Sequence, residues 1–248
     1  MQQVFIREED LIDDKVVITG EDAKHLGKVV RIRVGEVIRV STSAGESYLC
    51  EIQSANADEV IASVKERTAE TEPGNRIYLF QAIPKGDRME TVIEKAVELG
   101  VYEIIPVEMK YCVVKLDDKK KRSKVERWQK IAESAAKQSK RSLIPNIHEV
   151  VSFKEALKMA NECEVRLVPY ENEEGMKATK ESLLKITTDK SVSIIVGPEG
   201  GFAPEEIEIA RETMDVISLG KRILRTDTAA ITAMSLVMLQ SELAEADN

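Results

Sequence analysis

A glycine-rich turn at residues 197–201 is the segment of this chain best suited to hold a ligand. An apolar run, 192–196, precedes Gly197-Pro198-Glu199-Gly200-Gly201, and Pro204 with two acidic residues follows. This order is typical of a buried strand, a turn and the first turn of a helix. Ligands of α/β sheets bind at the carboxyl ends of strands, and three glycines there leave backbone groups open to a flat ligand. The spacing is equally compatible with an ordinary strand-to-helix turn.

Two further turns follow expected strands in the last third of the chain, at Val168-Pro169-Tyr170-Glu171 and at residues 219–228. The chain has no G-x-x-x-x-G-K-[ST] sequence, and no G-x-G-x-x-G sequence follows a strand. Their absence argues against a P-loop and against nicotinamide or flavin dinucleotides. Carboxylates and glycines in these turns favour a ligand with an adenine, a ribose and a positive centre over a phosphorylated one.

The elements that position these turns begin after a predicted linker at residues 68–75, which has no apolar residue larger than alanine. Before it, short β-like runs at 16–19, 37–42, 48–53 and 60–64 predict a small β-rich domain or barrel. After it, strands are expected at 76–83, 103–107, 165–169, 192–196 and 216–219. Helices are expected at 87–99, at 124–140, from a Ser152–Glu155 capping box to 160, and from about 228 to 243. The alternation predicts a mostly parallel sheet with helices on both faces.

Composition limits the classes of function. The 248 residues are 43% hydrophobic, enough for a core, yet no apolar run reaches the length of a membrane span and the first residues do not resemble a signal peptide. Cys50, Cys112 and Cys163 are far apart, without a C-x-x-C pair, and there are only two histidines. We therefore expect a cytoplasmic protein with reduced thiols, no disulfide frame and no metal site.

Charge is unevenly distributed along the chain. The net charge is −8, but residues 110–141 contain twelve Lys or Arg and four acidic residues, so this window carries +8 and the rest −16. Local basic surface on an acidic protein is what selective polyanion binding requires. For residues 117–124 alone, a solvated lysine loop is the simpler interpretation.

Several motifs in order resemble one superfamily of RNA-modifying enzymes. Residues 197–201 with Leu219-Gly220-x-Arg222-Ile223-Leu224-Arg225-Thr226-x-Thr228-Ala229 look like the SPOUT superfamily of S-adenosylmethionine-dependent RNA methyltransferases. His25-Leu26, Val30-Arg31 and Gly35 match its PUA-like amino-terminal module. Its first helix is matched by Lys85-Gly86-Asp87-Arg88 and Lys95-Ala96-x-Glu98-Leu99-Gly100, and its long basic helix by Gln138-x-x-Arg141 with Pro145. The likeness covers nearly the whole chain. It is nearest to the ribosomal RNA small subunit methyltransferase E family, which methylates N3 of a uridine in small-subunit (16S) ribosomal RNA.

The resemblance implies an α/β fold, a SPOUT-type mostly parallel sheet with a carboxy-terminal trefoil knot, after a small β-rich PUA-like barrel. It implies a PUA-like RNA-binding domain at 1–70 and a methyltransferase domain at 71–248. It also implies S-adenosylmethionine as cofactor, a homodimer, and small-subunit ribosomal RNA or the assembled small subunit as partner, with no metal and no membrane. The apolar segment 229–243 is either a dimer face or ordinary core.

By the same resemblance, the three turns form the cofactor pocket. The implied cofactor-binding residues are Val168, Pro169, Tyr170, Glu171, Gly197, Pro198, Glu199, Gly200, Gly201, Leu219, Gly220, Ile223, Leu224, Arg225, Thr226 and Thr228. The implied RNA-binding residues are His25, Arg31, Lys85, Arg88, Gln138 and Arg141. Gln138 and Arg141, three residues apart, would share one helix face.

The expected chemistry is methyl transfer, which depends on proximity and orientation. Uridine N3 becomes nucleophilic after losing its proton, and a guanidinium near the uracil oxygens would stabilise the anion. We hypothesise that Arg225 does this or orients the uridine, with Asp227 positioning Arg225; alternatively the two residues only pair and hold the loop.

Four positions depart from the family pattern. Asp227 stands where Glu is usual, Tyr111-Cys112 where Arg-Ser is frequent, Gln3 where an Arg is found, and Ser134 where Glu is common. These departures affect individual RNA contacts rather than the cofactor pocket. Two other functions stay open: methylation of another position such as a ribose 2′-oxygen, and a non-catalytic RNA-binding role in ribosome assembly.

Overall fold

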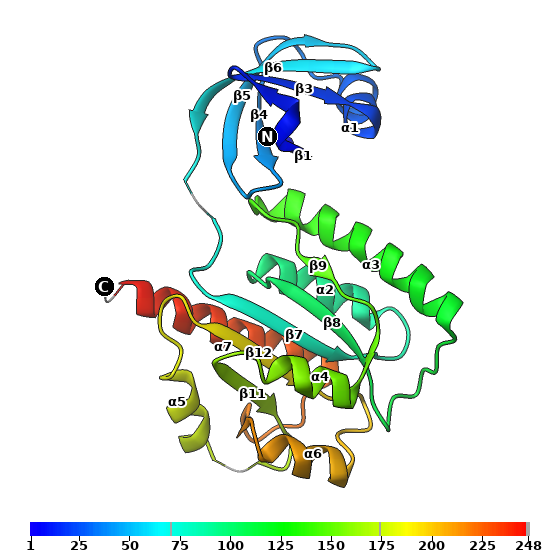
Figure 1. The fold of residues 1–248 in the computed structure, drawn as a ribbon, viewed down its shortest axis with the longest axis vertical. Coiled ribbons are helices and arrows are strands. Elements are labelled where there is room, and N and C mark those ends of the chain that lie inside the picture. Colours follow the sequence, from blue (N-terminus) through cyan, green and yellow to red (C-terminus); the bar gives the residue numbers. More distant parts are fainter. Residues whose placement is uncertain (70, 174, 247–248) are drawn as a thin grey trace. The chain divides into compact units, whose positions relative to one another are not determined.

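The computed structural model describes residues 1–69, 71–173 and 175–246 (Figure 1). The chain forms two compact units. The first, called the β unit here, comprises residues 1–72 together with 136–144. The second, the α/β unit, comprises residues 73–135 and the chain from Pro145 onward. The segment 136–144 therefore groups with residues far from it in sequence.

The β unit is one six-stranded sheet in the order β1-β4-β5-β6-β3-β2. Its strands are β1 (Gln3–Ile6), β2 (Leu11–Ile12), β3 (Lys15–Thr19), β4 (Val37–Thr42), β5 (Ser47–Ala55) and β6 (Glu59–Arg67). All neighbours pair antiparallel except β1 with β4. Alternate side chains such as Ile38 and Val40 point inward and are fully buried, as the two-residue period of strands requires.

Three short helical segments complete the β unit. They are η1 (Glu8–Asp10), α1 (Gly20–Lys24) and the π-helical η2 (His25–Val30). Arg31 ends η2 in the left-handed conformation, with φ 57°. Ala23 and Leu26 of these segments join the apolar core formed by the strands.

The α/β unit is a parallel sheet in the order β10-β8-β7-β12-β11-β13, with β9 beside β8. Its strands are β7 (Arg76–Ala82), β8 (Glu103–Glu108), β9 (Asn146–Ile147), β10 (Val151–Ser152), β11 (Val165–Pro169), β12 (Ser191–Val196) and β13 (Asp215–Ile217). Its helices are α2 (Arg88–Glu98), α3 (Asp118–Ser139, which runs on into the β unit), α4 (Phe153–Ala160), α5 (Lys177–Leu183), α6 (Pro204–Arg211) and α7 (Thr226–Ala246).

Helices cover both faces of this sheet (Figure 1). Residues of α4 and α6 pack with Phe80, Ile105 and Ile195 on one face. On the other face, α7 packs against α2, β12 and β7. Because β11 lies between β12 and β13, the loops that leave these three strands end side by side at one edge of the sheet.

The expected strands and helices are confirmed with shifted boundaries. The helix predicted at 124–140 begins six residues earlier, since the Asp117 carboxylate accepts from the Lys120 amide at 2.8 Å and caps it. The Ser152–Glu155 capping box is present. Strand β1 and helix α5 were not expected, because each is short and lacks clear periodicity.

The predicted linker ends in an anchor. The Asn75 side chain is 2% exposed, and its amide donates to the carbonyls of Thr187 (2.7 Å) and Lys190 (2.8 Å). Its carbonyl oxygen accepts from the Ser241 hydroxyl on α7. Asn75 therefore fixes the start of the α/β unit; residue 70 within the predicted linker lies outside the described residues.

Candidate functional site

The α/β unit holds a cavity of about 400 Å³ at the carboxyl ends of β11, β12 and β13. The three turns singled out in the sequence form its walls. The lining residues are Pro169, Tyr170, Glu171, Val196, Gly197, Pro198, Glu199, Gly200, Gly201, Phe202, Leu219, Gly220, Arg222, Ile223, Leu224, Arg225, Thr226 and Ala229. The volume is within the range of small-molecule sites in proteins.

Two of the residues predicted to contact the cofactor do not line this cavity. Val168 is fully buried in the sheet core, and Thr228 is exposed on the first turn of α7. Conversely, Val196, Phe202, Arg222 and Ala229 line the cavity without having been predicted to bind the cofactor. Phe202 directly follows the glycine pair and Arg222 lies inside the third turn, so extending each motif by one or two residues would have included them.

The glycines of the second turn leave no room for side chains. A Cβ atom on Gly197 would lie 2.9 Å from the Phe202 ring, and one on Gly200 would lie 2.9 Å from the Tyr111 Cβ. Gly201 has φ +72° and a Cβ there would lie 2.5 Å from Glu171 Oε1. Only glycine fits at these positions, and the bare backbone forms one wall of the cavity. This cradle fits a flat group such as an adenine.

Thr226 joins the third turn to the second. Its hydroxyl donates to the carbonyl of Gly197 at 2.7 Å and accepts from Nε2 of Gln81 at 3.0 Å. Gln81 is fully buried on β7. Thr226 and Gln81 therefore hold the start of α7 against the glycine turn, which fixes the relative position of two walls of the cavity.

The Glu199 carboxylate, predicted to contact the cofactor, accepts hydrogen bonds from the turn at residues 85–88. Its Oε1 accepts from the Lys85 amide at 2.9 Å and from Nη1 of Arg88 at 2.7 Å. Lys85 and Arg88 were predicted to contact RNA; the Lys85 side chain is exposed, while Arg88 is half-buried beside this carboxylate. The turn 85–88 thus supports the glycine turn from outside.

The predicted catalytic pair is not joined in this structure. Arg225 is exposed and lines the cavity, and within the described residues its guanidinium forms no hydrogen bond or ion pair. Asp227 is half-buried, and its buried Oδ1 has no hydrogen-bond partner in that same part of the chain. The cation is therefore available to a ligand.

The RNA-binding candidates of the β unit have different surroundings. His25, Arg31 and Gln138 are exposed. Arg141 is buried and pairs with the Glu72 carboxylate, which also accepts from the amides of Ser142 and Leu143. The expectation that Gln138 and Arg141 share a helix face is wrong, because α3 ends at Ser139 and Lys140 turns left-handed with φ 63°.

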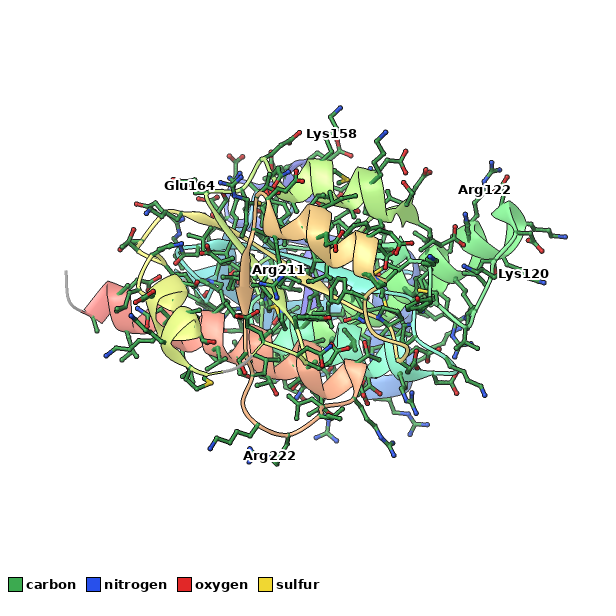
Figure 2. The ribbon with its side chains drawn as sticks, turned by 90° about the horizontal axis from the view of Figure 1, so that it is seen from below. Lys120, Arg122, Lys158, Glu164, Arg211 and Arg222 are labelled. Atoms are coloured by element: carbon green, nitrogen blue, oxygen red, sulfur yellow. The ribbon has the colours of Figure 1, made fainter. Side chains whose placement is uncertain are left out.

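The lysine run is helical, so the expected loop at 117–124 is wrong over most of its length. Lys119, Lys120 and Arg122 are exposed on the first turns of α3, and Figure 2 shows Lys120 and Arg122 extending away from the fold. Lys121 and Arg127 instead pair with Glu108 and Glu90, each at 2.7 Å. Part of the basic charge is therefore bound internally and part is displayed.

Neither a metal centre nor a membrane span is found in the part of the chain that the structure describes. No group of three or more His, Cys, Asp or Glu side chains there is placed to hold a metal ion. None of the described helices is long and apolar enough to cross a bilayer. All three cysteines are buried and unpaired, and burial raises the pKa of the Cys50 thiol to about 11.

Comparison with known proteins agrees with this architecture. Residues 70–238 match the model of an RNA methyltransferase domain, and residues 18–65 match that of an RNA methyltransferase PUA domain. The fold and site thus define an RNA methyltransferase of two domains.

Individual relatives narrow the family. Ribosomal RNA small subunit methyltransferase E of Bacillus subtilis is 38% identical over 93% of this chain and 92% of its own length, and the Mesomycoplasma hyopneumoniae protein of that name is 35% identical over 93% and 96%. The Neisseria gonorrhoeae protein of that name, solved bound to S-adenosyl methionine, has a TM-score of 0.83 at 29% identity, covering 96% of this chain and 97% of that chain. This chain belongs to the ribosomal RNA small subunit methyltransferase E family. The predicted fold class, a SPOUT-type mostly parallel sheet after a PUA-like β-rich domain, is confirmed. The expected closed barrel is instead an open six-stranded sheet, because β1 and β2 stand at opposite ends of the strand order.

Proposed function

We propose that this chain methylates N3 of a uridine in small-subunit ribosomal RNA, with S-adenosylmethionine as methyl donor. The observation that carries the proposal is the glycine-walled cavity where three turns meet, in a chain of this family. Pro169–Glu171, Val196–Phe202 and Leu219–Thr226 hold the donor, whose adenine lies against the bare backbone of Gly197 and Gly201.

The main task of the site is positioning. When bound, S-adenosylmethionine supplies a methyl group on a sulfonium, a leaving group that needs no covalent help. The chain contributes a rigid wall, because Thr226 and Gln81 tie the third turn to the second. Holding the acceptor nitrogen in line with the methyl group supplies most of the rate enhancement.

Arg225 stabilises the reacting uracil. Once N3 has lost its proton, the negative charge is shared with the neighbouring carbonyl oxygens, and a nearby guanidinium lowers the energy of this anion. Arg225 lines the cavity and has no internal partner among the described residues. Asp227, two residues on, carries an unpaired buried carboxylate oxygen and acts as the positioning residue for Arg225 when the uridine arrives.

RNA binds through exposed polar and basic side chains outside the cavity. Lys119, Lys120 and Arg122 on α3, with His25, Arg31 and Gln138, form the contacts that we assign to RNA. Phosphate contacts of this kind release counterions, so affinity should fall steeply with salt. The target uridine must be unstacked or already single-stranded to reach the cavity.

We also propose a homodimer and a cytoplasmic location. On α7, Met234 and Val237 are fully buried, whereas Leu239 and Leu243 are exposed, as is Ile223 in the preceding turn at 89%. Helix α7 thus supplies both core packing and an apolar surface that a second copy would cover.

The deciding experiment is in vitro methylation of small subunits and of naked ribosomal RNA, followed by mapping of the modified nucleotide. A new N3-methyluridine supports the proposal. Methylation of a ribose, or no methylation together with no heat of S-adenosylmethionine binding, would overturn it.

Arg225→Ala tests the assigned residue. Turnover should fall at least about 100-fold, as for loss of one charge-stabilising donor, while the affinity for S-adenosylmethionine stays within about threefold. Lys221→Ala is the matched control, because Lys221 lies in the same turn and is exposed but does not line the cavity. Unchanged turnover in Arg225→Ala would remove Arg225 from the mechanism.

A further inference from the structure

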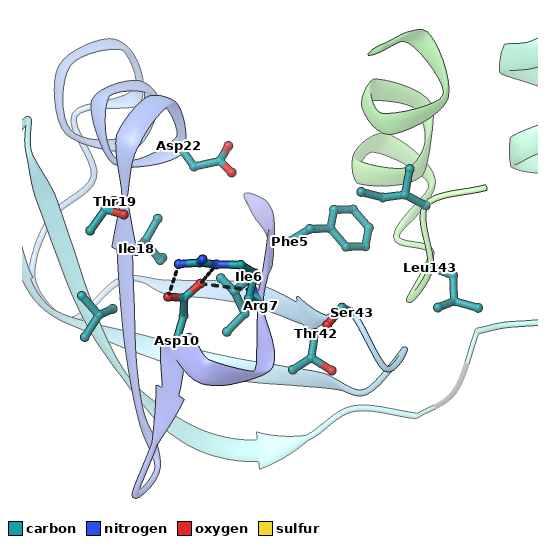
Figure 3. A pocket seen from close by; sticks show the side chains of 12 residues that line it. Phe5, Ile6, Arg7, Asp10, Ile18, Thr19, Asp22, Thr42, Ser43 and Leu143 are labelled. Atoms are coloured by element: carbon teal, nitrogen blue, oxygen red, sulfur yellow. Dashed lines mark hydrogen bonds and ion pairs between the residues drawn. The ribbon is translucent and has the colours of Figure 1, made fainter. Parts of the chain in front are cut away.

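A second cavity, of about 530 Å³, lies in the β unit (Figure 3). It is lined by both sides of the open sheet: β1 and the end of β4 on one side, and β3 with the following helix α1 on the other. Strands β1 and β2 stand at opposite ends of the strand order, so the sheet does not close into a barrel. The opening between the two ends of the sheet leaves a concave site, the usual form of a small-ligand site in a protein.

The cavity has an apolar lining with one aromatic ring. Phe5, which is half-buried, lines the cavity together with Ile6 and Ile18 of the apolar core, and Leu143 completes the lining from the segment that joins this unit after α3. Flat apolar surface beside an aromatic ring is what a nucleobase needs for stacking, since every base presents a π face.

Two polar side chains of the lining, Thr42 and Asp22, have oxygen atoms without a hydrogen-bond partner among the described residues. Thr42 is 2% exposed, and its hydroxyl has no hydrogen-bond partner within the described residues, although burial of an unpaired hydroxyl is costly. Thr42 itself is one of the residues that line the cavity. Asp22 uses Oδ1 to accept from Lys137 at 2.9 Å, which also brings an ammonium group beside the cavity. Oδ2 of Asp22 accepts no hydrogen bond in that part of the chain.

A planar cation is also held in place here. The Arg7 guanidinium donates from Nε and Nη2 to the two carboxylate oxygens of Asp10, at 3.3 and 3.2 Å, as Figure 3 shows. A guanidinium fixed in this way offers a flat face for stacking.

We propose that this cavity binds one unstacked nucleobase of the RNA substrate. The base stacks on Phe5, its edge is read by the Thr42 hydroxyl and by the free oxygen of Asp22, and its phosphate lies near Lys137. A carboxylate accepts from exocyclic amino groups, so adenine, cytosine and guanine bind in preference to uracil. The proposal rests on the RNA-modifying function above, but the site differs from the residues assigned there: neither His25 nor Arg31 lines the cavity.

The test uses the full chain with labelled isoleucine and leucine methyl groups, followed by NMR during titration with AMP, CMP, GMP or UMP. Methyl signals of Ile6, Ile18 and Leu143 should shift with the first three nucleotides and at least about fivefold more weakly with UMP. Ribose 5-phosphate, the control ligand, should leave them unchanged. Equal shifts with ribose 5-phosphate, or no shifts at all, would overturn the proposal.

Two variants separate recognition from folding. Thr42→Val removes a hydroxyl that has no partner, so the melting temperature should be kept or raised, while nucleotide affinity falls at least about threefold. Phe5→Leu keeps the apolar lining but loses the ring, and affinity should fall at least about fivefold. Thr68→Val is the matched control, because the Thr68 hydroxyl donates to the Ser47 carbonyl in the same unit but outside the cavity. Unchanged nucleotide affinity in both cavity variants would contradict the assignment.

Methylation assays distinguish this proposal from the function on which it rests. In both cavity variants KM for RNA should rise, with kcat and S-adenosylmethionine affinity unchanged. If the wild-type chain methylates N3 but its β-unit methyl signals do not shift when nucleotides are added, the nucleobase site is refuted and the proposed function is not. A chain that binds nucleotides here but methylates nothing would refute the function and leave the cavity standing.

Discussion

The two cavities are built by different means. That of the α/β unit has a wall of glycine backbone, in which Gly197, Gly200 and Gly201 each exclude a side chain. That of the β unit has ordinary strand side chains such as Phe5, Ile18 and Thr42, brought together from distant parts of the chain. A ligand held by backbone leaves a recognisable sequence motif, whereas one held by scattered side chains leaves none.

The arginines of the two units differ in whether they have a partner within the fold. Arg225, in the α/β unit, has no internal partner among the described residues, whereas Arg141, in the β unit, is buried against Glu72. Both arginines belong to motifs that resemble the family, so residue type alone does not separate a cation for a ligand from a cation for the fold.

Arg141→Ala should give the largest effect, on stability rather than on RNA affinity. The change leaves the Glu72 carboxylate buried without its cation, which costs about 3 kcal/mol of unfolding free energy. Urea unfolding measures it, with Gln138→Ala as an exposed control expected to leave stability unchanged. If Arg141→Ala keeps the native free energy of unfolding and loses RNA affinity instead, Arg141 contacts RNA after all. The contrast between Arg141 and Arg225 would then be wrong.

Gly201→Val should abolish donor binding while leaving the β unit unaffected. The new side chain meets Glu171 and requires a left-handed backbone, so the turn must move, and affinity for S-adenosylmethionine should fall about 100-fold in calorimetry. Gly35→Ala is the control: Gly35 has φ +87° with open space around it, and lies in the β unit. An affinity within threefold of the native value in Gly201→Val would show that this wall does not hold the donor.

Glu199→Gln should have a modest effect, because the amide oxygen can still accept from the Lys85 amide while the ion pair with Arg88 is lost. Partly exposed ion pairs contribute little free energy, so loss of this pair should weaken the affinity for S-adenosylmethionine by only about threefold. Arg88→Met should act through the same contact, and the double variant should be no weaker than either single one. Glu205→Gln, which breaks the exposed pair with Lys110, is the control; additive effects of the two changes would disprove the coupling.

Thiol reagents should not modify the cysteines of the native chain in either unit. Burial raises the pKa of Cys50 to about 11 and raises those of Cys112 and Cys163 as well. At pH 8 only about one Cys50 thiol in a thousand is then ionised, and this fraction grows as pH rises toward 11. Iodoacetamide at pH 8, followed by mass spectrometry, should leave the native chain unmodified and label all three cysteines in urea. Rapid labelling of the native chain would contradict this burial.

Local sequence signals and the tertiary structure determine different features of this protein. Apolar alternation and capping residues predicted most of the strands and helices, because these signals are local: the Ser152–Glu155 box and the run before Gly197 are examples. The glycine turn and the turn at 219–226 were predicted as walls of one cavity, and they meet.

Only the tertiary structure decided which polar groups are free. Glu199 and Arg141 engage partners about 111 and 69 residues away, Val168 is buried in the sheet, and Thr42 lines a cavity whose other walls lie up to about 100 residues away. Such pairings depend on which strands become neighbours, and strand order is a property of the whole sheet. The sequence by itself therefore determined the elements and the turns that wall the cavity of the α/β unit, while folding determined which charged groups pair within the fold and which are left open to a ligand.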